Sequence, residues 1–200
     1  SVQVEGVVTG MSLQQAVSRF EGATLLEEDN SYYVQVFDRI LEALLCISPT
    51  VEKSGLGCAF VGIRGLESMY RGDSGVVTAL SNVVPQGFSP RIGVAEAKFP
   101  AYVAASTSES GQAVRVLDDV QGFLQDRTLH LLPISRENKT RLLGFGLNTM
   151  GDVAALPLGS LQAQFGVEGR LAWELCNGID DSLLVPLTHK QSVTEYMAFS

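Results

Sequence analysis

The side chains that could bind a metal or act as a nucleophile are scattered along this chain. Three cysteines, Cys46, Cys58 and Cys176, lie far apart, and the two histidines, His130 and His189, have no evident partner. Zinc sites need such residues at short, regular spacing, so we expect no zinc site. No serine lies in a GxSxG turn, and no glycine-rich phosphate loop ending in lysine is present.

Three adjacent acids, Glu27, Glu28 and Asp29, are the densest carboxylate group in the chain. They could mimic a metal site. Acids that directly precede a helix also stabilise its N-terminus, and we favour this second role.

Three basic residues, Arg136, Lys139 and Arg141, could contact DNA phosphates. A solvated helix face is the alternative, and we favour it. Gly144 and Gly146 follow directly, where the helix should stop. We expect both to be helix-ending glycines with positive φ, with a DNA backbone contact as the alternative.

Composition limits the kind of partner that the chain can bind. Among its 200 residues 46% are hydrophobic and 18% charged, which favours a folded chain with a sizeable core. The formal net charge is −8, whereas proteins that bind nucleic acid by bulk charge are basic. Any DNA contact must therefore be local or weak.

The chain also carries hints of its location. No apolar run approaches the ~20 residues of a membrane span, so we expect no membrane association. Three irregularly spaced cysteines fit a reducing, bacterial cytoplasm. Because Ser1 is not Met, we expect the sequence to be a piece of a longer protein.

Hydrophobic periodicity predicts an α/β half followed by a helical half. Up to residue 117 it predicts helices at 11–20 (with Ser12 as N-cap), 32–47 (capped by 29–31), 67–70, 73–84 and 97–105 (broken or kinked near Pro100), and strands at 24–26, from 51, 58–63, 91–95 and 114–117. After Asp119 it predicts only helices, at 120–124, 129–132, 138–143, 149–156 (capped by Thr149), 161–165 and 169–176, and then a linker or tail at 188–200.

Several phrases, in order, resemble the Y-family (UmuC/DinB-like) DNA polymerases. Residues 10–16, GMSLQQA, resemble the "GMPLxxA" segment of the fingers, and residues 30–49 resemble the palm helix that ends in "SP". Residues 91–98, RIGVAEAK, resemble the "GIGxNK" turn, and residues 147–157, LNTMGDVAALP, resemble the thumb phrase "LxTxGDLAxLP". The resemblance covers about residues 6–187.

The resemblance implies an α/β palm with a small all-α thumb. It implies partial fingers at 1–29, a palm at 30–108, a thumb at 109–187 and a linker or tail at 188–200. The family's first palm strand, most of its fingers and its little finger would lie outside this sequence.

The resemblance also implies which residues should bind metal. Y-family polymerases transfer nucleotides with two Mg²⁺ ions, held by an Asp on the first palm strand and by an Asp-Glu pair in a phrase like "SIDEAYLD". The first Asp would precede Ser1. Gly57 and Cys58 stand at the Asp and Glu positions, and Gly62 replaces the final acid. Neither glycine nor a neutral thiol binds Mg²⁺ well, so we expect no metal site and no catalytic residue.

Two further departures agree with this loss. Lys98 matches the first lysine of the family's "NKxxAK" helix, but Tyr102 replaces the later lysine that reaches the incoming triphosphate. These two residues are at most a remnant of a nucleotide site. The thumb's Pro-Gly-x-Gly hairpin, which meets a DNA phosphate, is PISR at 133–136, and this should weaken DNA binding.

The losses together resemble the catalytically inactive ImuB-type branch of the family. The resemblance implies an adaptor in damage-induced mutagenesis that contacts a replicative-type polymerase, the sliding clamp and the recombinase. Two alternatives stay open at this point. One is an active lesion-bypass polymerase with displaced acids, and the other is an unrelated α/β interaction domain.

Overall fold

The computed structural model describes residues 11–19 and 27–187. The chain divides into two units, residues 1–35 and residues 36–200, and each is described by itself. The strand predicted at 24–26 and the tail predicted at 188–200 lie outside the described residues.

The first unit contains helix α1, Leu13–Arg19, and the beginning of helix α2, Asn30–Leu45. The predicted caps are confirmed. The Gln15 N–H donates to the Ser12 hydroxyl, and the Ser12 N–H donates to the Gln15 side chain, each at 3.3 Å. The Asp29 carboxylate accepts from the Tyr32 N–H at 2.9 Å. Both caps bond to groups three residues away, as N-caps do.

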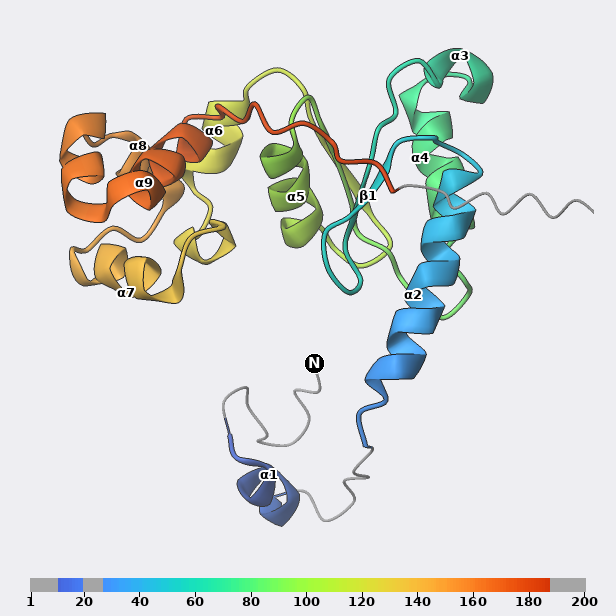
Figure 1. The fold of residues 1–200 in the computed structure, drawn as a ribbon, viewed down its shortest axis with the longest axis horizontal. Helices are drawn as coiled ribbons and strands as arrows, with labels where there is room; N and C mark the ends of the chain where they lie inside the picture. The colour runs from blue at the N-terminus through green and yellow to red at the C-terminus, as the bar shows by residue number, and fades with distance from the viewer. Residues whose placement is uncertain (1–10, 20–26, 188–200) are drawn as a thin grey trace, which may run out of the picture. The chain divides into compact units, whose positions relative to one another are not determined.

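The second unit continues with an α/β part (Figure 1). Its elements are β1 (Val51–Lys53), β2 (Ala59–Val61), α3 (Glu67–Tyr70), α4 (Asp73–Asn82), β3 (Ile92–Ala95), α5 (Lys98–Thr107) and β4 (Ala113–Val116). Strands β1 and β2 form an antiparallel hairpin, whereas β3 and β4 are parallel and α5 crosses between them. These are two separate two-stranded sheets.

A helical part follows β4, as predicted. It consists of α6 (Val120–Gln125), the short 3₁₀ helix Leu129–Leu131, α7 (Arg136–Gly144), α8 (Met150–Ala154) and α9 (Leu158–Cys176). Beyond β4 the described residues contain one isolated bridge, between Thr128 and Thr149, and no strand. Helix α9 is interrupted at Gly166, whose φ of 62° and ψ of −139° are not helical. This interruption agrees with the two helices predicted here.

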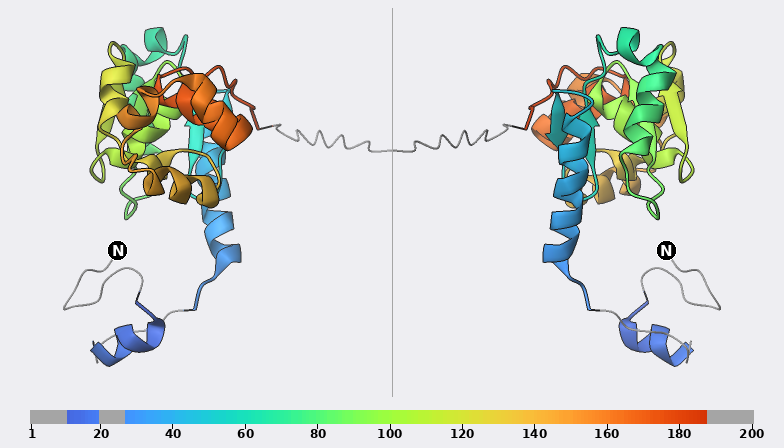
Figure 2. Two further views of the ribbon diagram at one scale, coloured as in Figure 1. Left: turned by 90° about the vertical axis from the view of Figure 1, so that its left-hand side faces the viewer. Right: turned by 90° about the vertical axis from the view of Figure 1, so that its right-hand side faces the viewer.

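Two hydrophobic cores stabilise the second unit. The first core joins α2, β1 and α4, and its buried members are Phe37, Leu41, Leu44, Val51, Val76 and Leu80. The second core joins α5 to the helical part, and its most deeply buried large side chains are Val103, Leu124, Leu129, Leu132, Leu142, Met150 and Val153. Figures 1 and 2 show α4 beside α2 and the helices after β4 gathered together. Helix α5 thus belongs to the same core as the helical part.

Three local predictions are wrong. Helix α5 is continuous through Pro100, because proline in the first turn lacks only an N–H that no helical carbonyl would accept. Hydrophobic periodicity places Tyr33 on the apolar, core-facing side of the helix predicted at 32–47, but Tyr33 is 42% exposed. The buried side chains of α2 begin only at Phe37. Gly144 is the last residue of α7 without a positive φ, whereas Gly146 has the predicted positive φ of 82°.

Candidate functional site

The two positions that should carry metal-binding acids lie in the turn between β1 and β2. The Ser54 N–H donates to the Cys58 carbonyl at 2.9 Å and closes the turn. Strand β2 begins only at Ala59, so the strand predicted from Cys58 is too long. Gly57 has a φ of 78° and Gly55 a φ of 128°. The turn therefore depends on backbone conformations that residues with L side chains rarely adopt.

Cys58 is half-buried at the end of this turn. Burial raises the pKa of its thiol, and a hydrogen bond with the Ser54 side chain offsets only part of that rise. The thiol is therefore protonated at neutral pH. A protonated thiol is a poor ligand for a hard cation such as Mg²⁺.

Glu52 is the carboxylate nearest in sequence to this turn, and it is already fully engaged. It accepts from the Lys98 ammonium at 2.9 and 3.0 Å and from the Val185 N–H at 2.7 Å. The Val185 N–H and the Lys98 ammonium lower the pKa of Glu52. Within residues 11–19 and 27–187 no three His, Cys, Asp or Glu side chains lie close enough to share a metal ion. The residues present do not fit a two-metal site.

Lys98 is the first residue of helix α5, and its ammonium donates hydrogen bonds to groups of the protein itself. Besides Glu52 it donates to the Leu183 carbonyl at 3.1 Å, and it lies 5.3 Å from the centre of the Phe60 ring. Tyr102, one turn later, packs half-buried against the second core. The structure does not bring the two side chains to a shared anion site, and their role as a nucleotide-binding remnant stays a prediction.

The N-terminus of α7, directly after residues 133–135, is occupied by a carboxylate of the chain itself. Glu168 of α9 accepts from the Ser135 hydroxyl at 2.7 Å, from the Asn138 amide at 2.6 Å and from the Ser135 N–H at 3.1 Å. These hydrogen bonds, the Ser135 hydroxyl first, lower the pKa of Glu168. A charged carboxylate thus lies where a helix N-terminus favours an anion.

The three basic residues predicted to contact DNA lie in α7 and differ in how far their side chains are already bound within the protein. Lys139 donates to the His130 carbonyl at 2.9 Å. Arg141 donates to the Asn138 side chain and to the Gln164 carbonyl, and it stacks 4.8 Å from the centre of the Phe165 ring. Arg136 is exposed in the first turn of α7. Of the three, Arg136 is the residue most open to an external phosphate.

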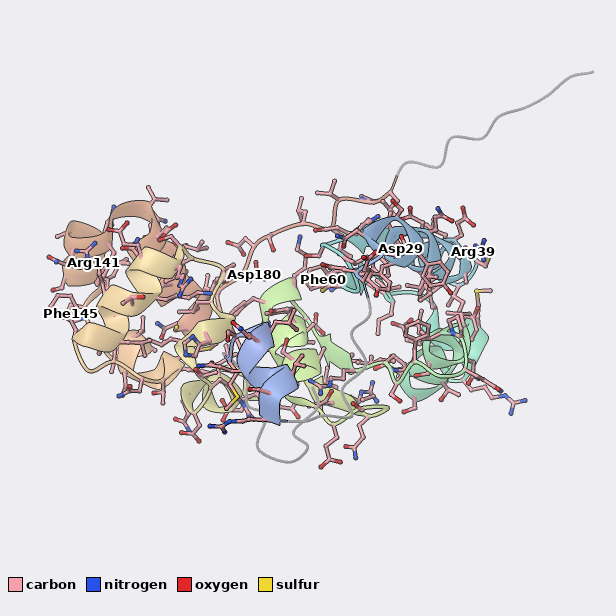
Figure 3. The ribbon with its side chains drawn as sticks, turned by 90° about the horizontal axis from the view of Figure 1, so that it is seen from below. Asp29, Arg39, Phe60, Arg141, Phe145 and Asp180 are labelled. Atoms are coloured by element: carbon pink, nitrogen blue, oxygen red, sulfur yellow. The ribbon has the colours of Figure 1, made fainter. Side chains whose placement is uncertain are left out.

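Gly144 and Gly146 flank Phe145 at the end of α7. Phe145 is 62% exposed, and its ring meets the Phe165 ring edge-on with 6.1 Å between centres. Arg141 and Phe145 lie at the same edge of the helical part (Figure 3). A Cβ added at either glycine would meet nothing within 4 Å. A DNA contact at the two glycines stays a prediction.

Sequence reasoning missed two carboxylates that join separate elements, Glu52 and Glu168. Their partners are 46 (Lys98) and 33 (Ser135) residues away in sequence. Capping patterns are recognisable at separations of three or four residues. No such local signal exists for these two. Asp180 lies in NGID at 177–180, a phrase that also resembles the family's thumb, but its contact with the Phe99 N–H, 81 residues away, has no local signal either.

The sequence of this chain is similar to that of known proteins. A model of the impB/mucB/samB family matches residues 2–106. The protein named DNA polymerase IV of Yersinia pestis (strain Pestoides F) is 29% identical over 196 residues, covering 94% of this chain and 54% of its own length. DNA polymerase IV of Dehalococcoides mccartyi (strain CBDB1) is 23% identical, covering 97% and 51%. The chain spans about half the length of these relatives.

Solved structures share the fold. A DinB family error-prone DNA polymerase from Sulfolobus solfataricus matches with a TM-score of 0.74 and 17% identity, over 90% of this chain and 56% of that one. A second structure, DinB from the same organism, matches with a TM-score of 0.70 and 19% identity, over 88% and 54%. No helix among the described residues is long and apolar enough to cross a membrane.

Proposed function

Because this chain belongs to the impB/mucB/samB family, with the fold of Y-family polymerases, we propose that it comes from a DNA-repair protein that acts by binding and not by nucleotide transfer. An unrelated α/β interaction domain is excluded by that membership. The proposed role is that of an adaptor in translesion synthesis. Its DNA partner and its activity remain proposals, since the chain spans about half of its relatives.

One observation carries the proposal. Gly57 and Cys58, at the positions of the family's acid pair, lie in a turn whose backbone at Gly57 has positive φ. The metal-binding side chains are missing at both positions, and the backbone at Gly57 has a conformation that favours glycine. Two-metal transfer needs carboxylates held in fixed geometry, and the engaged Glu52 cannot substitute without giving up its ion pair with Lys98.

Weak binding to DNA fits the helical part. Residues 115–187 contain six basic and nine acidic residues. Glu168 fills the N-terminus of α7, where a phosphate would otherwise be favoured. We assign residues 1–29 to partial fingers, 30–108 to the palm and 109–187 to the thumb, and we note that β4 (Ala113–Val116) pairs with β3 of the palm.

Contacts with a replicative-type polymerase, the sliding clamp and the recombinase are the protein partners we propose, by resemblance to the ImuB-type branch. A cytoplasmic, bacterial location goes with these partners. A pull-down of the full-length protein with each purified partner tests this part separately from catalysis.

Primer extension tests the main proposal. The full-length protein, with a primer–template and Mg²⁺ or Mn²⁺, should incorporate no nucleotide. DNA polymerase IV of Yersinia pestis serves as the positive control. Template-dependent incorporation by the full-length protein would overturn the proposal.

An active lesion-bypass polymerase with displaced acids is the second candidate. The name DNA polymerase IV of its relatives favours it. An Asp-x-Asp strand before Ser1 in the full-length sequence would raise this candidate, and the primer-extension assay decides between the two.

A further inference from the structure

Residues 180–187, called here the strap, lead away from the end of α9 without helix or strand structure. The strap returns to the α/β part, and Asp180 and Phe60 lie near this path in Figure 3. It makes hydrogen bonds to two elements, β1 and α5. Those two elements belong to different cores.

The strap is anchored at its beginning by Asp180. The Asp180 carboxylate accepts from the Phe99 N–H at 2.7 Å and from the Ser182 N–H at 3.1 Å. Helix α5 has no side-chain cap of its own, because Ala97 stands at the N-cap. An anion at a helix N-terminus is favourable, so Asp180 supplies the cap that the local sequence lacks.

The middle of the strap is held by the Glu52–Lys98 ion pair. Lys98 donates to the Leu183 carbonyl at 3.1 Å, and Glu52 accepts from the Val185 N–H at 2.7 Å. The side chains of Lys98 and Glu52 are only 20% and 16% exposed. The pair thus satisfies one backbone carbonyl and one backbone N–H of the strap, the two kinds of group that a neighbouring β-strand would pair with.

The end of the strap packs on the hairpin. The Leu187 N–H donates to the Val51 carbonyl at 2.7 Å, and Leu187 packs against the first core. A Cβ at Gly62 would lie 3.2 Å from the Leu184 side chain and 3.0 Å from Thr50. Leu184 of the strap therefore limits the space for a side chain at position 62, where the family has an acid. Glycine at this position leaves room for the strap.

Ion pairs also link the elements around the two cores. Sheets β1–β2 and β3–β4 share no ladder. Arg115 of β4 pairs with Asp73 of α4, and the pair Arg64–Glu96 is largely exposed at 91% and 72%. An exposed ion pair contributes little, so the strap with the Glu52–Lys98 pair and the half-buried Arg115–Asp73 pair are the stronger of these connections.

We propose that the strap couples the α/β part to the helical part, and that Glu52 and Lys98 keep the strap bound to β1 and α5. When the pair is intact, the helical part keeps one orientation relative to the β1–β2 hairpin. When the pair is broken, the strap is released while both cores stay folded. This conformational device is independent of nucleotide transfer and goes beyond the proposed function.

Hydrogen exchange of the full-length protein tests the proposal. Glu52→Gln and Lys98→Met should each speed exchange in peptides covering 181–187 by about ten-fold, the effect of losing a charge-assisted hydrogen bond. Peptides from α4 and α7 should not change. The matched control is Asp38→Asn, which breaks the exposed Asp38–Lys53 pair on the residue next to Glu52 and touches no part of the strap.

The double variant separates coupling from local loosening. If the strap opens as one segment, Glu52→Gln with Lys98→Met should exchange no faster than either single variant. Additive effects, unchanged exchange at 181–187, or faster exchange throughout both cores would each overturn the proposal. A failed strap would leave the primer-extension result untouched, so the two ideas can fail separately.

Discussion

At the scale of the residue, the backbone at Gly57 matters more than the missing carboxylates. Its φ of 78° closes the turn between β1 and β2, and a Cβ there would meet no neighbouring atom within 4 Å. Space is therefore not the obstacle to an acid at this position. The obstacle is a conformation that favours glycine.

Restoring the acids should not restore chemistry. Gly57→Asp with Cys58→Glu should leave primer extension at background and lower the free energy of unfolding by about 1–2 kcal/mol, because an L residue must adopt positive φ. Urea unfolding of this chain measures the loss, with Cys58→Ser alone as the control. Nucleotide incorporation by the double variant would contradict the role given to the turn.

Glu168 should make stability depend on pH. Because the folded pKa of Glu168 lies below the ordinary value of a glutamate, its contribution to stability is present above the unfolded pKa and is lost as pH falls through the folded pKa. Wild type should therefore exceed Glu168→Gln in urea midpoint at pH 7, and the difference should shrink by pH 3. Glu137→Gln, at an exposed position in the first turn of α7, should show a smaller change. Equal changes in the two variants would mean that the pH dependence comes from the overall charge of the chain and not from the hydrogen bonds of Glu168.

At the scale of the element, α9 is two helices joined at Gly166. The φ of 62° and ψ of −139° at this residue let the chain turn between them. Glu168, which caps α7, follows two residues later. The bend therefore positions a residue that another helix requires.

Gly166→Ala should destabilise the chain by about 1–3 kcal/mol, the usual cost of a non-glycine residue in this region of backbone space. Gly159→Ala is the matched control in the same helix, because a Cβ there meets nothing within 4 Å and no positive φ is needed. It should leave stability unchanged or raise it slightly. Thermal unfolding of both variants measures the contrast, and similar losses would contradict the assigned bend.

The sequence predicted elements where the signal was local. The caps at Ser12, Asp29 and Thr149 could be read from residues three positions apart, and periodicity separated the α/β part from the helices. The contacts of Glu52 and Glu168 could not be read, because their partners come from distant elements. Fold and order were therefore predictable, whereas the side chains that join elements were not.

At the scale of the whole molecule, a net charge of −8 opposes binding to DNA. Favourable contacts must come from individual exposed cations. Arg136 is one of them, since it is exposed as the first residue of α7. Arg141 is held by its own neighbours.

Arg136→Gln in the full-length protein should weaken binding to a labelled primer–template and lower the slope of log affinity against log salt by about 0.9, the share of one phosphate contact. Arg141→Gln should mainly lower stability, because its contacts are internal. Fluorescence anisotropy at several salt concentrations measures the first effect and urea unfolding the second. An unchanged salt slope in Arg136→Gln would exclude its phosphate contact.

The three free thiols differ in access: Cys46 is exposed, Cys58 half-buried and Cys176 buried. Burial raises the pKa of Cys176 to about 12, so its thiolate is scarce until the second core opens. A thiol reagent should therefore label Cys46 first, Cys58 next and Cys176 last. The labelling rate of each cysteine therefore reports on the opening of a different part of the structure. The three rates together give the order in which these parts unfold, without any engineered probe.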